Sequence, residues 1–325
     1  MRLKVLSRLT AMIITMGFAV TMNAQTEAEA VEALKDGVSK SQSKDYLGAI
    51  ESFKECVNIY DELDLSNSGN RATAASQIPN TQYKYALSLY KKKDYDGSIA
   101  AFEKVVEYSD TYEDPKMKSK AERTIPRLYY AKGAGLIKSE DYTGALAALD
   151  KSIELDPDYP MSYIRKAQVY KAQDDEASFK QAIDGALKAA DAKNDRKSEG
   201  TAKKLASNYY LVAGANAVKA QEWVNAEKSF NTLMEYKDAD EDIYYQLAVV
   251  YNKQSKWDAA IEAANKALEL MGDVETKDAK IHFEMGNSYY GKGDNAAACE
   301  AYGKANKGDY AEAAKYQIEH VVKCQ

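Results

Sequence analysis

The segment Asp45-Tyr46-Leu47-Gly48-Ala49 recurs along this chain with variations. A polar residue comes first, an aromatic residue second and a small residue fifth, at residues 45–49, 94–98, 141–145, 222–226 and 256–260. Each copy lies between two stretches whose apolar residues recur three and four positions apart, which is typical of amphipathic helices. The pattern therefore predicts a repeated unit of helix, tight turn and helix, and such units are stable when they stack.

Seven units of this kind and a final capping helix are predicted. The units are placed at residues 30–63, 79–112, 126–159, 160–191, 207–240, 241–274 and 279–309, and the capping helix at 310–323. The fourth unit departs most from the pattern, and its second helix is expected near residues 178–190. Because a stack grows by adding units, we expect residues 25–325 to form a single domain.

The pattern resembles the tetratricopeptide repeat, most closely where Leu247, Ala248 and Tyr251 precede Trp257 and Ala260. This resemblance implies an all-α fold, an α-solenoid of stacked antiparallel helix pairs that forms a right-handed superhelix. It also implies a concave groove, lined by the first helices, that binds extended peptides or partner helices. The chain departs from the family in its intervals between units, most of which exceed the usual length of about 34 residues.

Small residues recur in the first helices of the units, opposite the small residue that follows each turn. Glycine holds this place in four units and alanine in three, at Gly37, Ala86, Gly133, Ala167, Gly214, Ala248 and Gly286. We expect the two backbones of each unit to approach closely there, with aromatic residues such as Phe53, Phe102, Phe230 and Tyr302 filling the space beside the contact.

Prolines mark the longer units. Pro79, Pro126 and Pro160 stand in the same register before the turns, and helix-compatible residues precede the first two. We expect an extra helical segment before Pro79 and before Pro126 that meets the repeat helix at a kink or short break, because proline kinks or breaks a helix interior.

Residues 1–24 have the layout of a secretory signal peptide. Arg2, Lys4 and Arg8 precede an apolar run that is shorter than the roughly 20 residues needed to span a membrane. We expect cleavage near Ala24, although an uncleaved anchor stays an alternative. The mature chain is then exported, either periplasmic, secreted or associated with an outer membrane, without an integral membrane span.

The charge balance argues against nucleic acid as a partner. The chain carries 44 Lys and Arg against 50 Asp and Glu, for a net charge of −6, and loses further basic residues with the signal peptide. An acidic chain without a long basic run lacks the electrostatic attraction to phosphates on which nucleic-acid binding depends.

The cysteines and histidines match no catalytic or metal-binding template. Cys56 lies on an apolar helix stripe and is expected to be a buried free thiol, whereas pairing of Cys299 with Cys324 is left open. His282 and His320 have no ligand or triad partner at a diagnostic spacing. The acidic residues at 238–242 are interpreted as charge at a helix N-terminus. We expect no enzyme activity, no metal site and no cofactor.

Tyrosine is unusually frequent, with 25 residues against six phenylalanines. The family register places several tyrosines on the inner face of the first helices, beside Leu211 and Val218, with Lys91, Lys138, Lys219 and Lys253 following that row. The predicted partner-binding groove comprises Tyr83, Tyr90, Lys91, Tyr130, Lys138, Tyr245, Asn252, Lys253, Phe283 and Tyr290. The alternative is that these tyrosines fill space between helices and the lysines form a solvated edge.

These patterns predict a non-enzymatic interaction scaffold or adaptor of a bacterial cell envelope. Its partner is expected to be a protein or peptide segment with apolar and acidic character. A carbohydrate-capture accessory protein that uses aromatic stacking is the alternative, although Trp223 and Trp257 occupy turn positions where a packing role is expected. Self-association into a homo-oligomer stays open.

Overall fold

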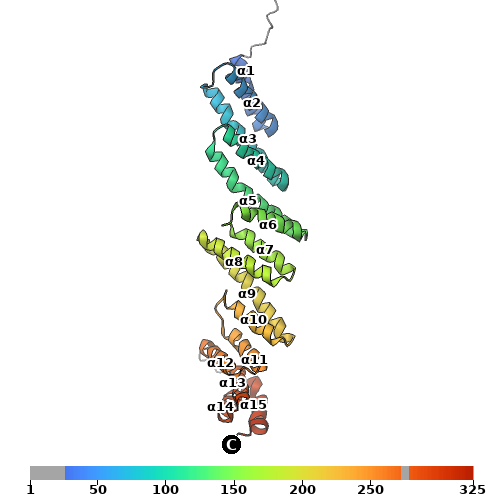
Figure 1. Cartoon of the computed structure of the whole chain (residues 1–325), viewed down its shortest axis with the longest axis vertical. Helices are drawn as coiled ribbons and strands as arrows, with labels where there is room; N and C mark the ends of the chain where they lie inside the picture. The colour runs from blue at the N-terminus through green and yellow to red at the C-terminus, as the bar shows by residue number, and fades with distance from the viewer. Residues whose placement is uncertain (1–25, 272–277, 325) are drawn as a thin grey trace, which may run out of the picture. The chain divides into compact units, whose positions relative to one another are not determined.

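The computed structural model describes residues 26–271 and 278–324, and the regular elements within them are helices, without a strand. The predicted signal peptide lies outside the described residues. Within them, no helix has the length and apolarity required to cross a membrane. The predicted all-α solenoid of helix pairs is confirmed, because helices consecutive in the chain pack against one another in pairs (Figure 1).

The contacts divide the chain into two compact units, Met1–Asp156 and Pro157–Gln325. The first contains α1 (Glu27–Gln42), α2 (Tyr46–Glu62), α3 (Gly69–Lys91), α4 (Tyr95–Thr111), α5 (Pro115–Lys138) and α6 (Tyr142–Leu155). A single domain over residues 25–325 stays a prediction.

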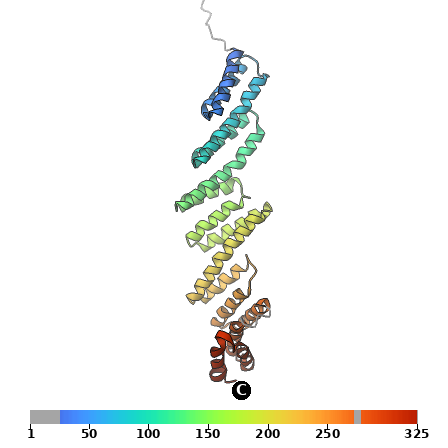
Figure 2. The same cartoon turned by 180° about the vertical axis from the view of Figure 1, so that it is seen from behind.

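Among its described residues, the second unit contains four further helix pairs and a C-terminal segment, drawn from light green to red in Figure 2. Its elements are α7 (Pro160–Ala172), α8 (Glu176–Ala192), α9 (Arg196–Lys219), α10 (Trp223–Leu233), α11 (Glu241–Lys253), α12 (Trp257–Met271), α13 (Ala279–Lys292), α14 (Asn295–Ala305), the 3-10 turn η1 (Gly308–Tyr310), α15 (Ala311–Tyr316) and the π-helical turn η2 (Gln317–Val322). The second helix expected near residues 178–190 is α8.

The recurring turn aspartate caps the second helix of its pair. The Asp94 carboxylate accepts the backbone N–H of Gly97 at 2.9 Å, and Asp45 and Asp141 accept from Gly48 and Gly144 in the same way. This bond satisfies one of the free N–H groups of the first turn. The residue before the turn position has a left-handed backbone in every pair, at Lys44, Lys93, Glu140, Asp174, Gln221, Ser255 and Gly293.

Steric matching inside the pairs agrees with the prediction. A Cβ built on Gly37 would lie 2.6 Å from the Phe53 ring, and one on Gly214 would lie 2.6 Å from the Phe230 ring. In the fourth pair the arrangement is reversed, because Gly185 of the second helix receives the ring of Tyr163 from the first. The rings therefore fill the space that the glycines leave, whichever helix supplies them.

Of the kink or short break predicted at the two prolines, the short break is wrong, and a kink stays a prediction. The extra helical segments exist, but α3 and α5 run through Pro79 and Pro126 as continuous helices. The carbonyl oxygen of Pro126 in α5 accepts a hydrogen bond from the Ser152 hydroxyl of α6 at 2.8 Å. Tertiary packing of the long helices therefore outweighs the loss of one internal hydrogen bond at each proline.

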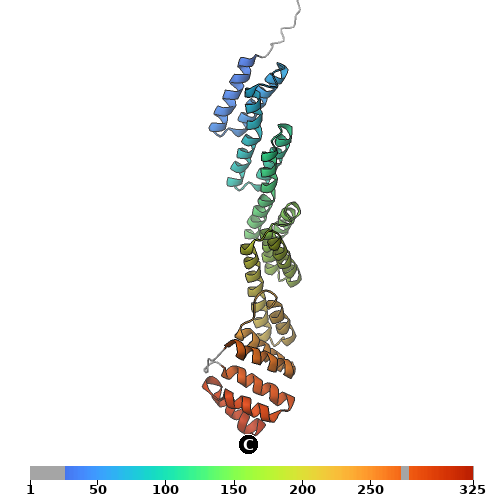
Figure 3. The same cartoon turned by 90° about the vertical axis from the view of Figure 1, so that its left-hand side faces the viewer.

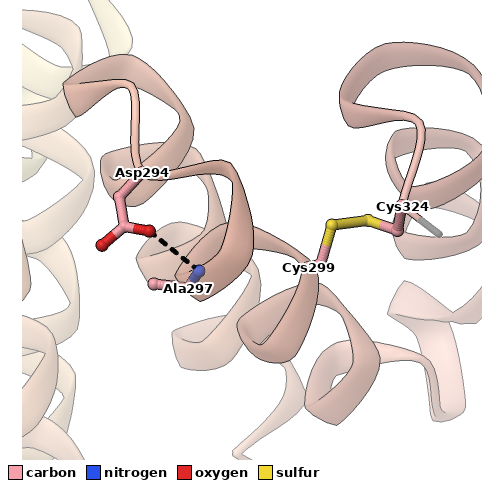
Figure 4. Close-up of a disulfide and its surroundings, with 4 residues drawn as sticks. All are labelled: Asp294, Ala297, Cys299 and Cys324. Carbon is pink, nitrogen blue, oxygen red and sulfur yellow. Dashed lines mark hydrogen bonds between the residues drawn. A yellow bond between two sulfur atoms is a disulfide. The ribbon is translucent and has the colours of Figure 1, made fainter.

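The C-terminal segment packs on the last helix pair. Val322 and Ile318 join the apolar cluster of Ala298 and Tyr302, and Cys324 forms a disulfide with Cys299 of α14 (Figure 4). Cys56 is fully buried and unpaired, as expected, and burial raises the pKa of its thiol.

Candidate functional site

An apolar groove of about 630 Å³ lies in the second unit between α9 and α11. Leu211 and Val218 of α9 form one wall, Phe230 and Leu233 of α10 form the floor, and Ile243 of α11 forms part of the opposite wall. Leu211 remains 45% exposed there although it is a large apolar residue. Surface leucines in a groove of this kind are candidates for contact with a partner.

The sequence explains why the groove is open. Asn208, Leu211, Ala215 and Val218 recur three and four apart, so they form a single stripe along α9. Helix α10 ends early, at Leu233, and an irregular connection over residues 234–240 leads into α11. The space beside the α9 stripe is therefore left without a covering helix turn.

The rim of the groove carries charged side chains, most of which form ion pairs with other side chains of the protein. Lys237 pairs with Asp240 at 2.7 Å, and Lys280 pairs with Asp242 at 2.6 Å. Burial opposes ionisation of Asp240, but the Lys237 hydrogen bond and the Ile243 backbone N–H together lower its pKa. Asp240 also caps α11, as the acidic run predicts. Lys219, on the α9 wall, is exposed and has no ion pair among the described residues.

The next pair of first helices, α11 and α13, lies side by side in the second unit (Figure 3), and polar contacts join the two helices. Asn252 is 9% exposed and donates its amide N–H to the Glu284 carbonyl oxygen at 2.9 Å and to the Glu284 carboxylate at 2.8 Å. Its amide oxygen accepts the Ser288 hydroxyl at 2.6 Å. This predicted groove residue therefore makes its hydrogen bonds within the protein.

Two other predicted groove residues lie against the C-terminal segment. The Tyr245 hydroxyl is 3.3 Å from the Tyr310 hydroxyl, and the Phe283 ring lies 5.3 Å from the Tyr310 ring and 5.5 Å from the Tyr302 ring. Burial, together with the hydrogen bond to Tyr310, raises the pKa of Tyr245. This role of Tyr310 was not predicted, because the contacts of the capping segment follow no repeat register.

In the first unit, Tyr83 packs within the fold and Tyr90 is open to solvent. The Tyr83 ring meets Phe102 edge-on at 5.1 Å, and the Lys120 ammonium lies 4.1 Å from the Tyr83 ring centre. Tyr90 is 43% exposed, and Lys91 beside it is exposed. Tyr83 thus fits the packing alternative, whereas Tyr90 offers an accessible ring.

The remaining predicted residues are accessible to different degrees. Lys138, Lys253 and Tyr290 are exposed, and Tyr130 is half-buried. The ten residues are divided between the two units, five in each. The floor residues of the α9–α11 groove were missed in the sequence analysis, because Phe230, Leu233 and Ile243 read as ordinary core positions of their own helices.

The histidine and tryptophan environments fit packing roles. His282 is largely buried, with Nε2 3.5 Å from Asp278, and burial lowers its pKa despite that carboxylate. A Cβ on Gly291 would lie 2.7 Å from the Trp257 indole, so this indole closes the contact between α12 and α13. Within the described residues, no group of three His, Cys, Asp or Glu side chains is placed to hold a metal. Carbohydrate capture stays a prediction.

Comparisons with known proteins point to one family. Family models described as tetratricopeptide repeat match residues 81–110, 126–159 and 241–271. No curated protein sequence matches the chain.

Several solved structures are similar at low identity. YrrB, described as a TPR protein with an unusual peptide-binding site, is 19% identical, with a TM-score of 0.31 over 60% of this chain and 88% of its own. The TPR2AB domain of yeast Sti1, solved as a complex with pHSP90, is 17% identical, with a TM-score of 0.30 over 90% of this chain and 96% of its own. A repeat protein from Parabacteroides merdae is 12% identical, with a TM-score of 0.27 over 89% of this chain and 96% of its own.

Superpositions at these TM-scores do not define a fold. The assignment instead follows from the three matched stretches and from recurring helix pairs, four of which place a glycine of one helix against an aromatic ring of the other. The chain is a tetratricopeptide-repeat protein.

Proposed function

We propose that this protein is an exported, non-enzymatic scaffold that binds a segment of a partner protein in the groove between α9 and α11. The observation that carries the proposal is the exposure of Leu211, 45%, above an apolar floor in a groove of about 630 Å³. A partner side chain that covers Leu211 would bury its apolar area together with that of the groove floor.

The chemistry of the lining suggests the kind of segment that fits. The floor offers apolar contact to residues spaced along one face of a helix or an extended strand. Lys237, Asp240 and Asp242 are already paired, which leaves Lys219 as the charge available to a partner. The favoured occupant is therefore an apolar segment with an acidic residue near Lys219. Tyr90 and Tyr290, both exposed, are proposed to extend the binding surface within their own units.

Export is supported by two observations. Residues 1–24 have the layout of a signal peptide. Disulfides persist mainly in oxidising compartments, and the Cys299–Cys324 bond is of that kind. Cell fractionation with N-terminal sequencing tests this part: a mature N-terminus near Gln25 outside the cytoplasm agrees with it, and an intact Met1 in the cytoplasm contradicts it.

Site-specific photocrosslinking tests the groove. A photoreactive phenylalanine analogue at Leu211 should crosslink a partner in the native cell envelope, because its side chain opens into the groove. The matched control is Val224 of α10, which is 70% exposed and outside the groove lining. Crosslinks of the same intensity and identity at both positions, or crosslinks at Val224 alone, contradict the proposal.

The exposed tyrosines are better probes than the packed ones. Substituting Tyr245 or Phe283 would also disturb Tyr310, so a loss of binding there has two explanations. Tyr90→Ala and Tyr290→Ala change accessible rings. If neither variant alters partner capture, the tyrosine row is not part of the binding surface.

A further inference from the structure

A second open site lies in the first unit, between the turn of the first helix pair and α3. This crevice of about 590 Å³ is lined by the lysines Lys44, Lys84, Lys91 and Lys92 and by the apolar side chains of Leu47 and Leu87, among others. Leu47 is 52% exposed at its mouth. The crevice thus combines an apolar patch with a cluster of lysines in a chain whose net charge is −6.

The four lysines lack compensating charges. Lys44, Lys84, Lys91 and Lys92 are all exposed, and none has an ion pair in the part of the chain that the structure describes. Asp45, the carboxylate among the lining residues, is held as the cap of α2 by the Gly48 N–H at 3.2 Å. Lysine near the C-terminal end of a helix is favoured by the helix dipole, which accounts for Lys91 and Lys92 at the end of α3 and for Lys44 after α1, but not for Lys84.

The last two helix pairs provide an internal comparison in the same register. Asp258 stands two residues after the turn residue Lys256. Lys292 stands two residues before the next turn residue, Asp294. The side chains of Asp258 and Lys292 form an ion pair at 2.5 Å. In the first unit, the corresponding positions are held by Leu47 and Lys92. The acid that neutralises this lysine elsewhere is therefore replaced by an exposed leucine.

The second helix pair also has an acid at this position, but this acid pairs with a lysine of another register, nine residues before the turn residue Asp141. Asp96 follows the turn residue Asp94 by two positions, as Leu47 follows Asp45, and Asp96 pairs with Lys132 of α5. The Leu47 crevice thus lacks a carboxylate that two other junctions supply internally.

We propose that this crevice binds an acidic peptide segment that carries an aliphatic side chain. Its carboxylates would pair with Lys84, Lys91 and Lys92, and its aliphatic side chain would cover Leu47 and Leu87. Charge complementarity favours the acidic ligand, because an incoming carboxylate would stand beside Lys92 as Asp258 stands beside Lys292. The inference concerns residues outside the α9–α11 groove and stands without it.

The test uses the mature protein and a fluorescein-labelled, capped hexapeptide of alternating glutamate and leucine. Fluorescence anisotropy should show saturable binding that weakens as salt rises. Leu47→Asp should weaken it by about tenfold or more, because the new carboxylate pairs with Lys92 and removes the apolar contact. Val224→Asp, in the same register of another repeat and also exposed, should leave the affinity within about twofold.

A second variant separates the chemistry from the introduced charge. Lys84→Gln combined with Lys92→Gln should also weaken binding, without adding an acid to the site. Thermal unfolding of each variant confirms that the fold is kept. The proposal is overturned by any of three results: no saturable binding to the wild-type protein, equal loss with Val224→Asp, or equal affinity for a peptide of alternating lysine and leucine.

Discussion

The junction between α9 and α11 is open, whereas the junction between α11 and α13 is closed, and one register position distinguishes them. Val218 and Asn252 each stand four residues before the turn residue of their repeat. Asn252 ties α11 to α13 through Glu284 and Ser288, but Val218 has no polar atom and lines the apolar groove instead. A repeat scaffold can therefore keep its helix pairs and vary its surface at the junctions between them.

The closed side of the second unit also carries a covalent bond, which gives the largest expected effect. The Cys299–Cys324 disulfide closes a loop with a sequence separation of 25, so Cys324→Ser should destabilise the last helix pair by about 3 kcal/mol. Hydrogen exchange of α14 measures this loss. A reductant should reproduce it in the wild-type protein and add nothing in the variant. Unchanged protection of α14 in the variant would show that packing alone holds the segment.

Asn252→Val should open the closed junction. It removes three hydrogen bonds and leaves the Ser288 hydroxyl without that acceptor in a buried position, at a cost of about 2 kcal/mol. Chemical denaturation checks the change. Asn225→Val is the matched control. Asn225 is exposed, and the one side-chain hydrogen bond described for it goes to Glu222, the N-cap residue of the same helix. Equal destabilisation by both variants would show that the hydrogen bonds of Asn252 do not stabilise the contact between α11 and α13.

His282 makes the closed side sensitive to acid. Burial lowers its pKa in the folded protein, while Asp278 opposes and Lys304 and Lys307 reinforce the shift. The unfolded chain therefore binds the proton more readily, and stability should be lost as pH falls below about 6.5.

Hydrogen exchange of α13, corrected for intrinsic rates, should report this loss between about pH 7.5 and pH 5.5. His282→Tyr supplies the residue that Tyr210 and Tyr244 place in this register, and should reduce the dependence. A pH dependence that persists unchanged in this variant would assign it to another group.

Val218→Asn should have the smallest effect on stability, within about 0.5 kcal/mol, because Val218 is half-buried at a groove wall. Its expected effect is on binding, since it places a polar group on the apolar wall. Denaturation and partner affinity measured on the same samples separate the two. A large loss of stability would mean that Val218 belongs to the core.

The repeat register predicted the helix pairs, the capping turns and the glycine–ring contacts, because each depends on residues close in sequence or in the same pair. It also placed Leu211, Val218 and Lys219 together. Features that do not follow the repeat register were not predicted. They are the continuous helices through Pro79 and Pro126, the reversed contact of Tyr163 with Gly185, and the packing of Tyr310 on Phe283. These depend on long-range packing, which can override local preference.

The affinity of the crosslinked partner for Leu211→Glu and Val224→Glu, measured side by side, tests most directly whether the α9–α11 groove is the binding site. Both substitutions add one negative charge at an exposed apolar residue, and they differ in whether that residue lines the groove. We predict a loss of about tenfold or more for Leu211→Glu and a change within about twofold for Val224→Glu. Equal affinities for the two variants would contradict the account.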